Sequence, residues 1–123
     1  MSALTILLVA AGGGVGASLR FLLDGTINAG RQFRIPVGTL TINITGSLAL
    51  GLITGAATHL GALPVAILGT GVMGGYTTFS TASFETVRLA RGGRITAAAV
   101  NGLGMLVVSV AAATAGILLG THL

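Results

Sequence analysis

Apolar residues fall into four long blocks along the chain, separated by short stretches that carry the charges and the two prolines. The blocks cover about residues 3–23, 36–58, 64–89 and 95–119. About 20 residues of α-helix cross the roughly 30 Å hydrocarbon core of a bilayer. The pattern predicts an all-α membrane protein in which residues 1–123 form a single domain of four transmembrane helices.

The third block is interrupted near its middle by small and polar residues, Gly74-Gly75-Tyr76-Thr77-Thr78-Phe79-Ser80-Thr81. Irregular backbone at membrane depth is tolerated only where protein or a water-filled cavity surrounds it. We therefore expect the third helix to break at mid-membrane, and we expect the functional site to lie at this break.

Two further helices carry polar stripes at helical spacing. The stripe on the second helix consists of Thr39, Asn43 and Ser47, and the stripe on the fourth consists of Asn101 and Ser109 with Met105 between them. Residues four apart lie on one face of a helix. Hydrogen bonds between membrane helices, worth about 1 kcal/mol each, are one interpretation of these stripes. The other interpretation is a narrow polar track between the helices.

Composition and charge agree with a membrane setting. Charged residues make up 7% of the chain and the mean hydropathy is +1.00, whereas about a quarter of the residues are charged in soluble domains. All six basic residues flank the first and third connections: Arg20, Arg31, Arg34, Arg88, Arg91 and Arg94. By the positive-inside tendency, we expect these loops in the cytoplasm and both termini outside, in a cell inner or plasma membrane. The arginines form no basic face with interleaved aromatic residues, so we expect no nucleic-acid partner.

Residues that could perform catalysis are few and scattered. The acids Asp24 and Glu85 fit structural pairing with nearby arginines, and His59 and His122 are isolated from both. None of them forms a nucleophile, base and orienter arrangement. We therefore predict that the protein is not an enzyme.

Three motifs resemble the Fluc (CrcB) fluoride channels. They are Gly13-Gly14-Val15-Gly16-Ala17-Ser18-Leu19-Arg20, Pro36-Val37-Gly38-Thr39-Leu40-Thr41-Ile42-Asn43-Ile44-Thr45-Gly46, and the Gly74 to Thr81 stretch followed by Glu85. The resemblance covers the whole four-helix outline. It implies a fluoride channel built as an antiparallel, dual-topology dimer, with two fluoride pathways and one structural Na⁺ at the dimer interface.

The resemblance also implies roles for particular residues. Backbone carbonyls of Gly74 and Thr77 would bind Na⁺, and Arg20 would line an electropositive vestibule. The fluoride pathway would use Asn43 as an amide donor, the ring edge of Phe79, and hydroxyl groups such as those of Ser80 and Thr81. The polar stripes add Thr39, Ser47, Asn101 and Ser109 to the predicted pathway. Strong donors can replace the water of a tightly hydrated anion, and a ring edge is electropositive. A mid-membrane lysine would hold the anion too firmly for conduction.

The chain departs from the family pattern at positions that bear on the pore. Ala82 stands where the family has a second Phe, and Phe84 is rotated from that position by about 200° around a helix. In the fourth helix, Asn101 and Met105 stand where a Tyr and a Ser are usual. These departures put in question whether one chain completes two fluoride pathways.

Alternatives remain open for assembly and for function. The uneven arginines and Ala82 favour pairing with an oppositely oriented paralogue, whereas the ordinary alternative is a homodimer. A small multidrug-resistance-type proton-coupled exporter has similar dimensions, but it needs a membrane-embedded carboxylate, which the first predicted helix lacks. A non-conducting membrane assembly subunit is the third possibility.

Overall fold

The computed structural model describes residues 2–30 and 36–123, and all regular elements within them are helices. The elements are α1 (Ala3–Asn28), α2 (Val37–Gly55), α3 (Ala57–Leu60), α4 (Ala62–Val65), the π-helix η1 (Ala66–Met73), α5 (Gly74–Tyr76), α6 (Ser80–Arg91) and α7 (Ile95–Gly120). Four helical stretches of this part of the chain are long and apolar enough to cross a membrane: Ala3–Asn28, Val37–Gly55, Ala62–Arg91 and Ile95–Gly120. This confirms the predicted all-α architecture with four candidate spans. Arg31 and Arg34 lie outside the described residues.

Helix α1 continues past the apolar block that predicts it. It ends at Asn28, whereas the block ends near Leu23. Side-chain hydrogen bonds support the additional turn: Thr26 Oγ1 donates to the Leu22 carbonyl over 2.8 Å, and Asn28 Nδ2 donates to Asp24 Oδ1 over 3.1 Å. The helix therefore extends beyond its hydrophobic part.

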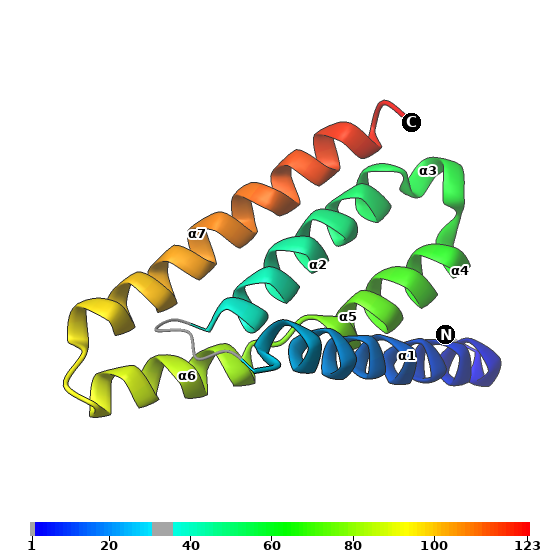
Figure 1. The fold of residues 1–123 in the computed structure, drawn as a ribbon. Coiled ribbons are helices and arrows are strands. Elements are labelled where there is room, and N and C mark those ends of the chain that lie inside the picture. Colours follow the sequence, from blue (N-terminus) through cyan, green and yellow to red (C-terminus); the bar gives the residue numbers. More distant parts are fainter. Residues whose placement is uncertain (1, 31–35) are drawn as a thin grey trace.

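Helices α2 and α7 run side by side, and glycines allow their backbones to approach closely (Figure 1). A Cβ atom on Gly51 would overlap the Ala113 carbonyl, and one on Gly55 would lie 3.0 Å from the Gly120 Cα. The hydrophobic effect does not drive helices together within a membrane, because lipid tails are as apolar as the side chains. Membrane helices therefore depend on close packing contacts such as these. The spacing of Gly51 and Gly55 indicates this interface in the sequence, and Gly116 and Gly120 are its counterpart on α7.

Helix α1 packs against η1 and α5 in the same manner. A Cβ atom on Gly16 would overlap the Val72 carbonyl, and one on Gly75 would overlap the Gly13 carbonyl. The two glycine-mediated contacts hold α2 against α7 and the first part of the third span against α1.

The third span is not one continuous helix. It is a π-helix in η1 and one α-helical turn in α5, and then Thr77 takes an extended conformation with φ −79° and ψ 158°. Helix α6 begins at Ser80 and lies against α7 (Figure 1). The interruption therefore falls inside the predicted stretch but is shorter, because Gly74–Tyr76 is helical. Its depth in a bilayer stays a prediction.

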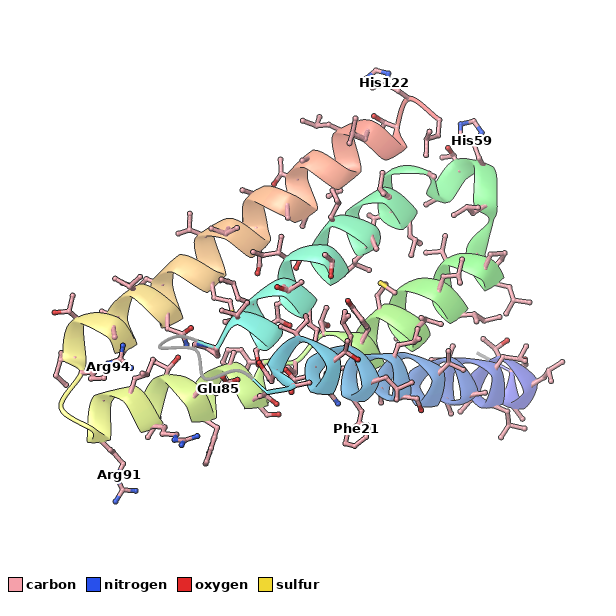
Figure 2. All side chains as sticks on the ribbon, viewed as in Figure 1. Phe21, His59, Glu85, Arg91, Arg94 and His122 are labelled. Atoms are coloured by element: carbon pink, nitrogen blue, oxygen red, sulfur yellow. The ribbon has the colours of Figure 1, made fainter. Side chains whose placement is uncertain are left out.

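Side chains divide the molecule into a small core, an apolar exterior and two polar ends. Ile42 and Met105 are among the few buried apolar side chains, whereas large apolar residues such as Leu103 are exposed along the spans. Arg91 and Arg94 lie at one end and His59 and His122 at the opposite end (Figure 2). This distribution suits spans surrounded by lipid.

Candidate functional site

The non-helical segment after α5 is held by one side chain from α2. The backbone N–H of Thr78 donates to Asn43 Oδ1 and Asn43 Nδ2 donates to the Thr78 carbonyl, each over 2.9 Å. Both residues are buried, at 8% and 7% exposure. A buried backbone amide and carbonyl need partners, so the Asn43 side chain supplies the pair that a continuous helix would have supplied.

The two hydrogen bonds between Asn43 and the Thr78 backbone, which we call the clamp, change the surroundings of two backbone carbonyls. In a continuous α-helix the Thr78 N–H would donate to the Gly74 carbonyl, but here it donates to Asn43. Similarly, the Thr81 N–H would donate to the Thr77 carbonyl, but it donates to Thr78 Oγ1 over 3.1 Å. The carbonyls of Gly74 and Thr77 have thus lost their usual helical partners.

The Thr78 hydroxyl organises the first turn of α6. Besides accepting from the Thr81 N–H, Thr78 Oγ1 lies 3.3 Å from Ser80 Oγ and donates to Thr81 Oγ1 over 3.2 Å. A hydroxyl that accepts from a backbone N–H three residues later is typical of a helix start. Thr78 therefore stabilises both sides of the interruption, through its backbone and through its side chain.

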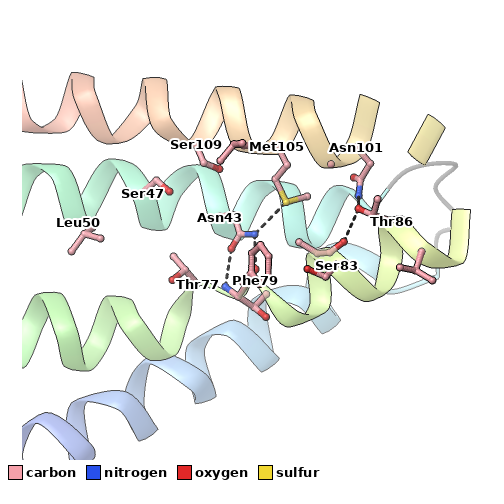
Figure 3. A pocket seen from close by; sticks show the side chains of 15 residues that line it. Asn43, Ser47, Leu50, Thr77, Phe79, Ser83, Thr86, Asn101, Met105 and Ser109 are labelled. Atoms are coloured by element: carbon pink, nitrogen blue, oxygen red, sulfur yellow. Dashed lines mark hydrogen bonds between the residues drawn. The ribbon is translucent and has the colours of Figure 1, made fainter. Parts of the chain in front are cut away.

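A cleft of about 500 Å³ opens between α2, α6 and α7 beside this clamp, and we call it the amide cleft (Figure 3). Its polar lining residues are Asn43, Ser47, Thr77, Thr78, Ser83, Thr86, Asn101 and Ser109. Phe79 also lines it and is 87% exposed, and Ala82 lines it at the position where the resemblance predicts a Phe. Phe84 is not among the described lining residues, which agrees with its expected rotation away from Ala82.

Polar groups in the amide cleft differ in whether they already have partners. Asn101 Nδ2 donates to Thr86 Oγ1 over 2.8 Å, and Thr86 Oγ1 in turn donates to the Ala82 carbonyl over 2.8 Å (Figure 3). Asn43 Nδ2 also donates to Met105 Sδ over 3.2 Å. Ser109 Oγ is buried, and it has no hydrogen-bond partner within the described part of the chain.

A second cleft, of about 340 Å³, lies on the other side of Thr78, and we call it the arginine cleft. Its lining residues are Ala17, Arg20, Phe21, Asp24, Thr39, Ile42, Thr78 and Thr81. Thr39, which is 4% exposed, donates from Oγ1 to Glu85 Oε1. Glu85 therefore has a hydroxyl group as its hydrogen-bond partner, and it also interacts electrostatically with Arg88, one of the nearby arginines that the sequence suggested.

The predicted pathway residues are distributed over both clefts. The amide cleft contains Asn43, Ser47, Phe79, Asn101 and Ser109, and also Thr77. The arginine cleft contains Arg20, Thr39 and Thr81. Ser80 and Gly74 line neither cleft, although Ser80 contacts the Thr78 hydroxyl. The two groups meet at Thr78, and their roles in transport stay predictions.

Sequence reasoning did not assign roles to Thr78 and Thr86. Thr78 belongs to the polar stretch, and its spacing to Thr81 is that of a helix-capping hydroxyl, which is a recognisable pattern. No comparable pattern marks Thr86. Its partner Asn101 is 15 residues away on the next helix, so the contact depends on how α6 packs on α7.

The chain is similar to known proteins over almost its entire length. The family model described as CrcB-like protein, Camphor Resistance (CrcB), matches residues 7–117. The chain is 48% identical over 122 residues to fluoride-specific ion channel FluC 1 of Leifsonia xyli subsp. xyli, covering 98% of this chain and 89% of that protein. It is 49% identical over 122 residues to fluoride-specific ion channel FluC 2 of Cutibacterium acnes, covering 97% and 99% respectively. Fluoride-specific ion channel FluC of Geobacter metallireducens is 41% identical over 125 residues, covering 98% and 99%.

Proposed function

The chain belongs to the CrcB family of multi-pass membrane proteins, and we propose that it is a fluoride-selective channel through which fluoride leaves the cytoplasm passively. The observation that carries this proposal is the amide cleft, in which amide and hydroxyl groups gather at an interrupted helix within an otherwise apolar chain. The names of its relatives, each a fluoride-specific ion channel, support the choice of ion.

The chemistry of the amide cleft suits a small, strongly hydrated anion. Asn43, Ser47 and Ser109 provide N–H and O–H groups that can replace water around fluoride, and no charged side chain is among the described lining residues. Strong but neutral donors permit both entry and release, which conduction requires. The exposed ring of Phe79 at the cleft adds an electropositive edge.

We assign the arginine cleft to the approach of the anion. Arg20 and Thr39 line it, and Thr81 connects it to the hydroxyl group of Thr78, which also lines the amide cleft. A positive charge in a confined cleft raises the local concentration of anions, and the carboxylate of Asp24, which lines the same cleft, opposes this effect. Fluoride would therefore gather beside Arg20 and pass Thr78 and Thr81 before it reaches Asn43.

An antiparallel dimer with two pores is the assembly that we propose. Phe79 is 87% exposed and the amide cleft is open, so a second subunit can cover both. Thr45 Oγ1 and the Tyr76 hydroxyl pair over 2.9 Å on a face where Thr45 and Gly74 are exposed. Polar groups at a span surface are better placed against protein than against lipid.

A structural Na⁺ at the centre of this dimer is consistent with the backbone of the third span. The carbonyls of Gly74 and Thr77 have lost the N–H groups that would pair with them in a continuous helix, because Asn43 and Thr78 Oγ1 take those N–H groups. Unwound backbone carbonyls are typical ligands of Na⁺ in membrane proteins. The bound ion would add a positive charge between the two subunits.

The uneven distribution of arginines between the connections and the small residue Ala82 both bear on which chain forms the second subunit. An antiparallel homodimer requires one sequence to insert in both directions, and strongly asymmetric loop charges favour one direction. We propose that arginine-bearing connections face the cytoplasm and that a paralogue of opposite orientation supplies the missing aromatic ring beside Ala82. Expression of this chain alone tests the point. Dimers with full fluoride flux in liposomes would show that a homodimer is sufficient.

Fluoride efflux from liposomes, measured with a fluoride electrode, tests the channel function. Phe79→Ala and Asn43→Ala should each abolish efflux, because one removes the ring at the cleft and the other removes its amide donor. Phe84→Ala is the matched control, since Phe84 is 68% exposed and lies outside both described clefts. Size-exclusion chromatography should show unchanged assembly for the two Phe variants. Absence of efflux in the wild-type protein would instead favour a non-conducting assembly subunit, and unchanged flux in both variants would show that Phe79 and Asn43 do not form the pathway.

A proton-coupled exporter is the second candidate, and Glu85 is the observation that favours it. This carboxylate lies within the candidate span Ala62–Arg91, where such groups often carry protons. Its contact with the buried Thr39 hydroxyl supports a structural role instead. Fluoride efflux that is independent of an imposed proton gradient would exclude the exporter.

A further inference from the structure

The amide group of Asn43 has its oxygen and both of its hydrogens directed at identified atoms. Because a backbone N–H can only donate, the 2.9 Å contact with the Thr78 N–H fixes which end of the amide is Oδ1. The Thr78 carbonyl then accepts one Nδ2 hydrogen over 2.9 Å. The other hydrogen is directed at Met105 Sδ on α7, 3.2 Å away.

Met105 is an unusual partner for that hydrogen. A thioether sulfur is a weak acceptor, whereas the carbonyl that holds the first hydrogen is a strong one. Met105 is only 5% exposed, so water does not compete freely for the same hydrogen. Ser109, one turn further along α7, has a buried Oγ without a partner in the described residues. The amide cleft thus contains one N–H of Asn43 that has only a weak acceptor, and the Ser109 hydroxyl, which has no hydrogen-bond partner in the described residues.

We propose that Met105, by accepting the second Asn43 hydrogen only weakly, sets how tightly that hydrogen binds fluoride. This inference rests on the proposed function. Fluoride is a much stronger acceptor than a thioether, so it takes the hydrogen when it arrives. The sulfur takes the hydrogen again when fluoride leaves.

The proposal predicts an order of fluoride affinity that follows the acceptor at position 105. Met105→Leu keeps the apolar volume nearly constant but removes the acceptor, and such exchanges are well tolerated in packed interiors. Met105→Gln replaces the sulfur with a strong carbonyl acceptor. The fluoride concentration at half-saturation should be about threefold lower in Met105→Leu and about threefold higher in Met105→Gln, since one hydrogen bond changes an equilibrium by a small factor.

Side-chain amide signals can measure this directly, because the chain has three asparagines, Asn28, Asn43 and Asn101. Full-length protein labelled with ¹⁵N at asparagine, in lipid nanodiscs, should give three pairs of side-chain amide resonances. Asn28→Ser and Asn101→Ser identify the Asn43 pair by elimination. We expect Met105→Leu to shift the Asn43 pair, and we expect titration with sodium fluoride to give midpoints in the order Leu, Met, Gln from lowest to highest.

The matched control is Met73→Leu, which makes the same chemical change in η1 and outside both described clefts. It should leave the Asn43 pair and the midpoint unchanged. Unchanged Asn28 signals in the Met105 variants show that the fold is intact, and if Met105→Gln does not assemble, the comparison of Leu with Met decides. The role of Met105 would be overturned if Met105→Leu leaves the Asn43 side-chain resonances unshifted. It would also be overturned if the titration midpoints do not rise in the order Leu, Met, Gln. Wild-type protein in which fluoride moves no asparagine signal would overturn the fluoride function itself.

Discussion

Replacing Gly16 with alanine tests the helix contact on which the position of the third span depends. A Cβ atom at Gly16 would overlap the Val72 carbonyl and would lie 2.8 Å from the Tyr76 amide nitrogen. Both neighbours are backbone atoms, so no side chain can rotate out of the way. The change must therefore push α1 away from η1 and α5.

The size of the effect follows from this geometry. Forcing extra atoms into a packed interior typically destabilises a protein by about 1–3 kcal/mol. Because the blocking atoms belong to backbone, we expect Gly16→Ala to lie near the upper end, about 3 kcal/mol, which is more than about a hundredfold in the folding equilibrium. Gly14→Ala is the control on the same helix, since a Cβ atom at that position would have no described residue outside its own helical turn within 4 Å. It should stay within about 1 kcal/mol of wild type.

Tyr76 provides the assay. It is the only tyrosine of a chain without tryptophan, and its backbone borders the proposed overlap, so intrinsic fluorescence reports on α5 alone. Denaturation by sodium dodecyl sulfate in mixed micelles, followed by Tyr76 fluorescence, gives the stability difference. Because Tyr76 directly precedes the interruption at Thr77, fluoride efflux should fall in the Gly16 variant and persist in the Gly14 variant. Equal stability of the two variants would refute the proposed contact between α1 and the third span.

Two further substitutions test the contacts around the interruption. Thr78→Val should destabilise the protein by about 1 kcal/mol because it removes the hydroxyl that accepts from the Thr81 N–H, and Thr78→Ser should restore stability in the same denaturation assay. Glu85→Gln keeps an acceptor for the Thr39 hydroxyl and should retain fluoride efflux, whereas Glu85→Leu should lose about 1 kcal/mol of stability. Complete loss of transport in Glu85→Gln would indicate that Glu85 must ionise during transport.

The sequence predicts the interruption of the third span but not how it is stabilised. Hydroxyl residues and glycines in an apolar block indicate that the helix cannot continue unchanged. The clamp depends on Asn43 and Thr78, which are 35 residues apart and come together only when α2 packs beside the third span. The π-helical turns of η1 leave no clear mark in the hydrophobic pattern, because almost every residue there is apolar or glycine.

Predicting the polar stripes was only partly successful for the same reason. Spacing correctly groups residues on one face of a helix, but it does not tell which neighbour that face meets. On α2, Asn43 and Ser47 line the amide cleft while Thr39 lines the arginine cleft. On α7, Asn101 is held by Thr86, while Ser109 has no partner in the described chain. The stripe residues thus lie in two clefts that both include Thr78, and their role as a pathway stays a prediction.

The clamp explains why an asparagine suits position 43 better than a hydroxyl residue or an aspartate. Outside a helix, the buried backbone of Thr78 presents one N–H and one carbonyl, and a side-chain amide matches both with groups of opposite kind. A serine or threonine hydroxyl is too small to reach both groups, and an aspartate lacks the hydrogens for the carbonyl and for Met105. The same amide releases the Gly74 carbonyl from helical pairing, because it takes the Thr78 N–H. Asn43 therefore connects the shape of the amide cleft to the position of the Gly74 carbonyl. A shift of the Asn43 side chain alters both, because the same amide lines the cleft and takes the Thr78 N–H.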